Sequence, residues 1–294
     1  MYQVVSKILF NREVSATYYR IGLDCPEIAS KAAPGQFIMA KVSNQLDPFL
    51  RRPFAIHRIR KTGAETKGTG GDSVVEILYN VVGKGTKIMS EMKVGDKIDL
   101  LGPVGNGFRI GSTMGAAILV AGGIGVAPLL SLAEGIRLQR SGVKPLLLFL
   151  GGKAGDDVLC VEDFERLGVE VRVATEDGSL GHRGVVTDLL LNYLDSREYG
   201  SILPSHLFAC GPETMLKEVA KIAREKKIPC QVSLETRMAC GLGACLGCVV
   251  KTRSRVQPSK REGDRETGGQ ELRIDYKRVC KEGPVFDSNE VLWE

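Results

Sequence analysis

The fold is decided by the stretch Ala116-Ala-Ile-Leu-Val-Ala-Gly-Gly-Ile-Gly-Val-Ala-Pro128. Its apolar start predicts a buried strand, and its glycines Gly122, Gly123 and Gly125 let a backbone approach a pyrophosphate at the start of a helix. Pro128 suits the first helical turn, where no N–H donor is needed. The stretch lacks the G-x-G-x-x-G fingerprint, and the same glycines could serve a simple tight strand–helix turn.

Strands and helices alternate from this stretch onward, within a domain expected at residues 111–228. We expect strands at 116–120, 145–150, 169–174 and 206–210, and helices at 128–140, 161–167, 185–194 and 213–226. This alternation predicts a doubly wound parallel sheet, which binds ligands beyond the carboxyl ends of its strands. Cys210 ends one such strand, so it is either a residue of the ligand site or an ordinary buried thiol.

Residues 1–110 read instead as a run of short strands, which predicts a small antiparallel barrel. The expected strands are 4–10, 18–23, 36–42, 54–60, 74–82 and 97–101, with one helix at 86–92 and an exposed hairpin tip at 63–72. Two barrel segments could bind anions. Arg51-Arg52-Pro53 offers bidentate guanidinium groups, or is only a surface pair. Gly85-Thr86 opens the helix, where Thr86 could also be an ordinary cap.

Residues 229–294 form a third segment, marked by three cysteines in nine residues and a fourth further on: Cys240, Cys245, Cys248 and Cys280. The spacing C-x4-C-x2-C…C is that of plant-type [2Fe–2S] ligation. A four-cysteine zinc site is the alternative, although zinc sites usually pair two C-x2-C units. Such a cluster would stabilise a segment too small to build a large core of its own.

Composition narrows the class of protein. The 294 residues carry a formal net charge of +5, which gives no case for nucleic-acid binding. The apolar runs are too short to span a bilayer, so we expect no membrane association. The other four cysteines are scattered and no signal peptide is visible, which favours free thiols and a cytoplasmic location. The three histidines share no triad or metal spacing.

Five motifs occur in one order along the chain: Leu50–Ile56, Leu78–Thr86, Leu101–Phe108, Ser233–Cys248 and Cys280–Phe286. Together with the glycine loop and Cys210-Gly-Pro, they resemble the ferredoxin–NADP reductase superfamily. The cysteine motif makes the chain similar to electron-transfer subunits of NAD-dependent dihydroorotate dehydrogenases. The expected fold is therefore a flavin-binding β-barrel, an α/β nucleotide domain and a small [2Fe–2S] domain.

The resemblance implies three cofactors, FAD, NAD and a [2Fe–2S] cluster, on one oxidoreductase subunit. It assigns FAD to Arg52, Pro53, Phe54, Ala55, Leu78, Tyr79, Asn80, Gly85 and Thr86. It assigns NAD to Gly122, Gly123, Gly125 and Pro128, places Cys210 near the nicotinamide, and makes Cys240, Cys245, Cys248 and Cys280 the cluster ligands. Relatives usually carry Ser or Thr where Ala55 stands, so the hydroxyl expected near flavin N5 is missing here.

The implied activity is electron transfer from the FMN of a separate dihydroorotate dehydrogenase catalytic subunit, through the cluster and FAD, to NAD. Two copies of each subunit would form a heterotetramer. Alternatives are a subunit of a ferredoxin–NAD(P) oxidoreductase or hydrogenase complex, and a non-catalytic zinc adaptor. Lys153 could attract the 2′-phosphate of NADP, and Trp293 could cover a flavin or fill a crevice. Lys251–Arg273, within an unusually long cysteine spacing, could be a partner-contacting arm or a solvated hairpin.

Overall fold

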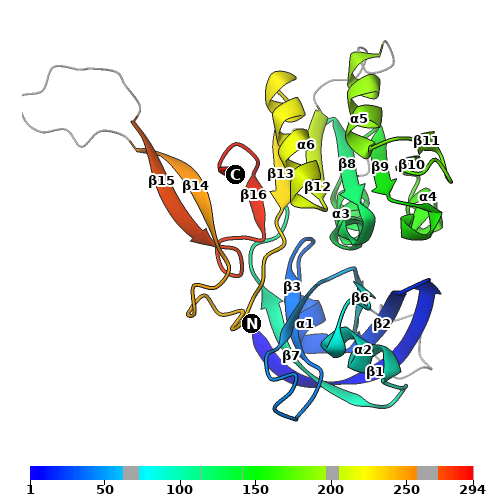
Figure 1. Cartoon of the computed structure of the whole chain (residues 1–294), viewed down its shortest axis with the longest axis vertical. Helices are drawn as coiled ribbons and strands as arrows, with labels where there is room; N and C mark the ends of the chain where they lie inside the picture. The colour runs from blue at the N-terminus through cyan, green and yellow to red at the C-terminus, as the bar shows by residue number, and fades with distance from the viewer. Residues whose placement is uncertain (62–72, 113, 141, 197–204, 257–270, 294) are drawn as a thin grey trace, which may run out of the picture.

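The computed structural model describes residues 1–61, 73–112, 114–140, 142–196, 205–256 and 271–293. Figure 1 shows an antiparallel β body built by the first part of the chain and an α/β body built by the middle. A two-stranded hairpin from the last part projects away from both. The expected hairpin tip at 63–72 lies outside the described residues.

The N-terminal body is a seven-stranded antiparallel sheet with the order β4-β3-β7-β1-β2-β6-β5. Its edge strands β4 and β5 are separated along the chain by only Ile56 and His57, so the sheet curls back on itself. The elements are β1 Tyr2–Ser15, β2 Tyr18–Asp24, α1 Pro26–Lys31, β3 Phe37–Lys41, β4 Arg52–Ala55, β5 Arg58–Lys61, β6 Ser73–Asn80, α2 Lys84–Glu91 and β7 Lys97–Val104.

Two expectations for this body were wrong in detail. The single strand expected at 54–60 is two strands, because the backbone turns at Ile56 and His57. A helix that the sequence reading overlooked, α1, starts with Pro26 and buries Ile28 and Ala29 against the barrel core. Proline in the first turn is a recognised helix-start signal.

The middle body is a second seven-stranded sheet with the order β11-β10-β9-β8-β12-β13-β16. All neighbours are parallel except β13 and β16. Helices α3 and α4 share one buried core with one face of the sheet, and α5 and α6 share another core with the opposite face. The doubly wound prediction is therefore confirmed.

The bounds of its elements follow the expected alternation closely. They are β8 Ala116–Gly122, α3 Val126–Gln139, β9 Leu146–Gly152, α4 Val161–Glu165, β10 Glu170–Thr175, β11 His182–Arg183, α5 Val186–Asp195, β12 Ser205–Cys210, α6 Glu213–Glu225, β13 Cys230–Ser233 and β16 Val285–Asp287. Short 3-10 turns follow β8 and β9, at Gly123–Gly125 and Gly155–Asp157.

The C-terminal segment adds two strands to this sheet. Residues 229–294 supply β13 and β16, which pair antiparallel at the sheet edge. Between them, β14 Val249–Val256 and β15 Glu271–Arg278 form the projecting hairpin (Figure 1). Both ends of the charged insertion, residues 251–256 and 271–273, thus belong to this strand pair, and residues 257–270 lie outside the described part. The cysteine loop at 240–248 is consequently anchored by the sheet on one side and the hairpin on the other.

A cluster of ion pairs joins the two large bodies. Asp163 of α4 accepts contacts from Arg20 of β2 at 3.2 Å and from Arg58 of β5 at 3.3 Å. Arg58 also reaches Glu134 of α3 at 2.6 Å, and Arg20 reaches the buried Glu76 at 3.3 Å. Because these side chains are largely buried, the barrel and the α/β body are held in one relative position. No described helix is long and apolar enough to cross a membrane.

Candidate cofactor-binding sites

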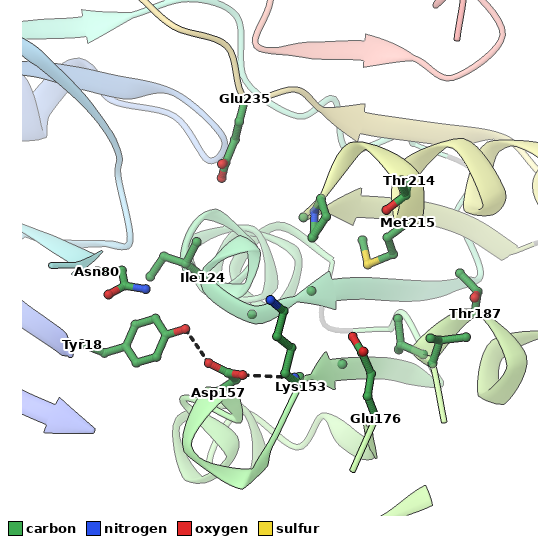
Figure 2. Close-up of a pocket in the computed structure, with 18 residues that line it drawn as sticks. Tyr18, Asn80, Ile124, Lys153, Asp157, Glu176, Thr187, Thr214, Met215 and Glu235 are labelled. Carbon is green, nitrogen blue, oxygen red and sulfur yellow. Dashed lines mark hydrogen bonds between the residues drawn. The ribbon is translucent and has the colours of Figure 1, made fainter. Parts of the chain in front are cut away.

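The first cavity, of about 580 Å³, lies at the carboxyl edge of the parallel sheet. Strand ends and the turns after them line most of it, and β2 and β6 of the barrel add one side (Figure 2). The lining residues include Gly122, Gly123, Ile124, Gly152, Lys153, Asp157, Glu176, Thr187, Gly211, Pro212, Met215 and Glu235. This is the edge where doubly wound sheets bind their ligands.

The glycine loop places backbone rather than side chains at the middle of this cavity. Gly122 and Gly123 line it, and Gly123 has a φ of +50°, which disfavours other residues. Gly125 packs instead against β12, where a Cβ would lie 2.2 Å from the carbonyl oxygen of Cys210. Pro128 faces the neighbouring cavity rather than this one. The loop therefore offers free N–H groups and a helix start to a pyrophosphate.

A barrel residue fixes the turn after β9. The hydroxyl of Tyr18 donates to Asp157 at 2.7 Å, and the other oxygen of that carboxylate accepts the backbone N–H of Lys153 at 3.0 Å (Figure 2). Burial and the neighbouring Asp157 raise the pKa of Tyr18 to about 12, so the hydroxyl stays a donor. Lys153 is thereby held over the cavity, pointing inward.

The second cavity, of about 420 Å³, lies between the barrel and the carboxyl edge of β12 and β13. Eight of the nine residues assigned to FAD line it: Arg52, Pro53, Phe54, Ala55, Leu78, Tyr79, Asn80 and Thr86. Its wall also holds the hydroxyl oxygen of Thr236, which is buried without a hydrogen-bond partner among the described residues. An orphaned buried hydroxyl beside apolar strands fits a planar ligand with polar edges, as a flavin is.

The ninth residue, Gly85, does not line the cavity, but it leaves room for the side chain of Arg52, which does. A Cβ at Gly85 would lie 2.7 Å from Nε of Arg52, so only glycine leaves room for that guanidinium. Arg51 points elsewhere and pairs with Asp99 at 2.7 Å. Thr86 accepts the backbone N–H of Gly83 at 3.2 Å, so it caps α2 and lines the cavity at the same time. The N-cap residue itself is Gly83, so Thr86 caps the helix from its third position, and its role in binding an anion stays a prediction.

Cys210 is a buried thiol at the end of β12, and its place near a nicotinamide stays a prediction. It is only 2% exposed and lines the second cavity. Burial raises the pKa of its thiol well above the usual range, so the group is a neutral thiol and not a nucleophilic thiolate. A neutral thiol at the junction of the cavities can pack against an aromatic ring but cannot attack it.

Glu235 is the site residue that the sequence reading missed. It lies two residues after β13, and it borders both cavities and a third one, of about 460 Å³, beneath the hairpin. Desolvation raises the pKa of its carboxyl. Had Cys230–Ser233 been read as one more parallel strand, the rule for strand ends would have pointed to it. Trp293 lines the third cavity and not the flavin cavity.

The four cysteines of the motif lie in two pairs. The thiols of Cys240 and Cys245 contact each other, as do those of Cys248 and Cys280. Among the described residues, no three His, Cys, Asp or Glu side chains converge as a single-metal site requires. Two pairs of thiols fit a cluster with two irons better than one zinc ion.

Backbone N–H groups point at these sulfurs. Leu242 donates to Sγ of Cys240 at 3.3 Å, and Cys280 donates to Sγ of Cys248 at 3.4 Å. Desolvation alone would raise the pKa of Cys240, but the hydrogen bonds outweigh it and lower the pKa to about 6. The hydrogen bonds therefore favour a thiolate at Cys240, the form that ligates iron, whereas burial and the neighbouring Cys248 raise the pKa of Cys280 to about 12.

The cysteine loop packs against the flavin side of the molecule. Gly241 has a φ of +69°, and a Cβ there would lie 2.5 Å from Cγ of Met39 in β3. Three residues earlier, Met238 lines the second cavity. The cysteine pairs and the proposed flavin cavity are thus neighbours within one packed region, as electron transfer between them requires.

Comparison with known proteins agrees with this arrangement. A family model described as the iron-sulfur cluster binding domain of dihydroorotate dehydrogenase B matches residues 235–261 and 265–292. A model described as the oxidoreductase NAD-binding domain matches residues 119–221. The fold resembles a ferredoxin NADP⁺ reductase from Neisseria gonorrhoeae, with a TM-score of 0.61, 17% identity, and coverage of 76% of this chain and 91% of that one.

A curled barrel, a doubly wound sheet and the two cavities between them define a reductase of the ferredoxin–NADP reductase class. The chain is 37% identical to the dihydroorotate dehydrogenase B (NAD(+)) electron transfer subunit of Desulforamulus reducens, over 98% of both chains. It is also 37% identical to that of Caldanaerobacter subterraneus, over 99% of both. The chain belongs to the family of dihydroorotate dehydrogenase B electron transfer subunits.

Proposed function

We propose that this oxidoreductase subunit carries electrons from a dihydroorotate dehydrogenase catalytic subunit, through a [2Fe–2S] cluster and FAD, to NAD. The observation that carries the proposal is the junction of the sites. Glu235 borders both the dinucleotide cavity and the flavin cavity, and Cys210 lines the flavin cavity next to Gly211, which lines the dinucleotide cavity. The cysteine loop packs on the barrel strand β3.

The protein's part is to position the cofactors, while the flavin, when bound, exchanges electron pairs with nicotinamide and single electrons with a cluster. We assign the nicotinamide end of NAD to the edge formed by Gly211, Pro212 and Glu235. The neutral Cys210 would pack against its ring, and Thr236 would hydrogen-bond an edge of the flavin. Ala55 offers no side-chain donor, so a flavin hydrogen bond there has to come from backbone.

The partner is part of the same proposal. The name of these relatives, electron transfer subunit, implies a separate catalytic subunit. We propose that this partner carries FMN and that two copies of each chain form a heterotetramer. We also propose a cytoplasmic location, because none of the eight cysteines of this chain is in a disulfide.

The test is co-purification of this chain with an FMN-type dihydroorotate dehydrogenase, followed by cofactor analysis and turnover. We expect one FAD, one FMN and about two irons per pair. The complex should reduce NAD with dihydroorotate, and this chain alone should reduce a dye with NADH. A chain that binds FAD and iron but reduces no dye from NADH would refute the assignment.

One observation favours a second candidate. The chain shares a TM-score of 0.76 and 27% identity with a chain of an NADH-dependent reduced ferredoxin–NADP oxidoreductase, over 99% of this chain and 90% of that one. A subunit of such a complex, or of a hydrogenase complex, would exchange electrons with ferredoxin. If reduced ferredoxin but not the dihydroorotate dehydrogenase partner drives NAD reduction, the second candidate replaces the first.

A further inference from the structure

The order of the strands shows which end of the first cavity takes which half of a dinucleotide. The glycine loop follows β8, in the middle of the sheet. β12 and β13 lie on the flavin side of β8, and β9 and β10 lie on the other side. With pyrophosphate on the loop and nicotinamide at the flavin, the adenosine half extends over β9 and β10. The end of β10 lies two strand spacings, about 10 Å, from the end of β8, on the adenosine side of the glycine loop.

Glu176 stands at that end of the cavity. It is the first residue after β10, and its side chain points into the cavity (Figure 2). Its backbone N–H donates to the carbonyl of Gly152 at 3.1 Å, which ties the ends of β9 and β10 together and fixes where the side chain starts. Its carboxylate is exposed and forms no ion pair with the described residues.

The other carboxylates of the cavity have different positions. Asp157 is committed to Tyr18 and to the backbone of Lys153. Glu235 lies at the opposite, flavin-side end. Lys153 follows β9, one strand nearer the glycine loop than Glu176, so its ammonium serves the pyrophosphate side. This leaves Glu176 as the charged group nearest the position of the adenosine ribose.

We propose that Glu176 is the residue that makes this chain select NAD over NADP, which deepens the proposed function and rests on it. A carboxylate accepts hydrogen bonds from two neighbouring ribose hydroxyls. The same carboxylate repels a 2′-phosphate, and like charges in contact cost several kcal/mol. The acidic residue that many dinucleotide folds place after the second strand is thus supplied here by the third.

The test compares NADH with NADPH as reductants of a dye, using the full chain with FAD and cluster. In Glu176→Gln the ratio of kcat/KM for NADPH to that for NADH should rise ~10-fold, because only the charge is removed. In Glu176→Arg it should rise ~100-fold. The matched control is Glu170→Gln at the opposite end of β10, where the carboxylate pairs with Arg172 and faces no cavity. Its ratio should match wild type.

A second measurement does not depend on turnover. Calorimetric titration should show wild type binding ADP-ribose more tightly than 2′-phospho-ADP-ribose, with the preference lost in Glu176→Gln. If wild type oxidises NADH and Glu176→Gln keeps both preferences within twofold, Glu176 is not the selector and the proposed function stands. If wild type reduces the dye from neither dinucleotide, the proposed function fails and this inference fails with it.

Discussion

The nucleotide half and the cluster half of this chain hold their sites in different ways. The FAD and NAD cavities are walled by strand ends of two seven-stranded sheets, with side chains such as Tyr79 and Cys210 only 2% exposed. The cysteine loop consists of turns and bends, and it exposes Leu242 by 50% and Leu246 by 62%. The nucleotide sites are therefore built by packing, whereas the cysteine loop has little packing of its own.

This difference indicates which interactions each site needs in order to keep its structure. A cavity walled by core strands keeps its shape without its ligand, so nucleotide binding should survive damage elsewhere. A loop with few buried contacts depends on bonds between its thiolates and a metal cluster, so cluster assembly and loop order should be gained or lost together. The following predictions separate the two halves, starting with the largest effect.

Replacing Cys280 by Ser should remove the cluster and leave FAD in place. The substitution removes one of the four proposed ligands, and the iron content should fall from about two per chain to near zero. The measurement is iron and FAD analysis of the purified variant, with visible absorption. Cys160→Ser is the control, because Cys160 lies beside His57 in the nucleotide half. Loss of iron and FAD together in Cys280→Ser would mean that the halves are not separable.

Asp163→Asn should loosen the interface between the barrel and the α/β body. It removes the carboxylate shared by Arg20 and Arg58, whose side chains are only 11% and 13% exposed. Arg20 keeps Glu76 and Arg58 keeps Glu134, so the change weakens two charge-assisted hydrogen bonds without leaving a guanidinium unpaired, which costs about 2 kcal/mol of unfolding free energy. Urea unfolding measures the loss.

The matched control is the preceding residue. Glu162→Gln breaks only an exposed pair with Arg166, which is worth less than about 1 kcal/mol. Equal midpoints for Asp163→Asn and Glu162→Gln would show that the ion-pair cluster does not hold the bodies together.

His57 makes the stability of the nucleotide half depend on pH. The ring is fully buried beside the carbonyl of Ala127, and burial lowers its pKa to about 4. The unfolded chain binds a proton below pH ~6.5, so stability is complete above that pH and falls as pH drops toward 4. At pH 5 the loss is about 2 kcal/mol.

The charges facing His57 act in both directions, since Arg20 and Arg58 lower its pKa and Asp163 raises it. His57→Gln should flatten the pH dependence between 6.5 and 4, as measured by urea midpoints at each pH. His182→Gln, at an exposed position, should leave the slope unchanged. A wild-type slope that persists in His57→Gln would assign the dependence to other groups.

The sequence predicted those features that depend on local pattern. The apolar runs around 116–128 and the helix after each strand follow from periodicity and glycine placement, and the structure has them within a few residues. The residues assigned to FAD came from the family resemblance, and the structure brings eight of the nine to one cavity although they come from β4, β6 and α2; their binding of FAD stays a prediction.

What the sequence did not predict depends on tertiary pairing. Cys230–Ser233 is too short to read as a strand alone, and only its pairing with β12 and β16 makes it one. Because β13 was not predicted, Glu235, two residues after it, was not predicted as a site residue. The ion-pair cluster could not be predicted from the sequence either. Arg20, Arg58 and Asp163 are far apart in the chain, and they come together only at the interface between the barrel and the α/β body.

The smallest effect tests how tightly packing shapes the flavin cavity. In Gly85→Ala the new methyl group would overlap Nε of Arg52, so the guanidinium has to leave its place and FAD affinity should fall ~10-fold. Gly83→Ala is the matched control, since a Cβ there meets nothing within 4 Å and its backbone is extended. Titration of FAD into each apoprotein, followed by flavin fluorescence, gives the two affinities. If Gly85→Ala binds FAD as tightly as Gly83→Ala, Arg52 does not hold the pyrophosphate, and the nucleotide half depends less on packing than its buried walls indicate.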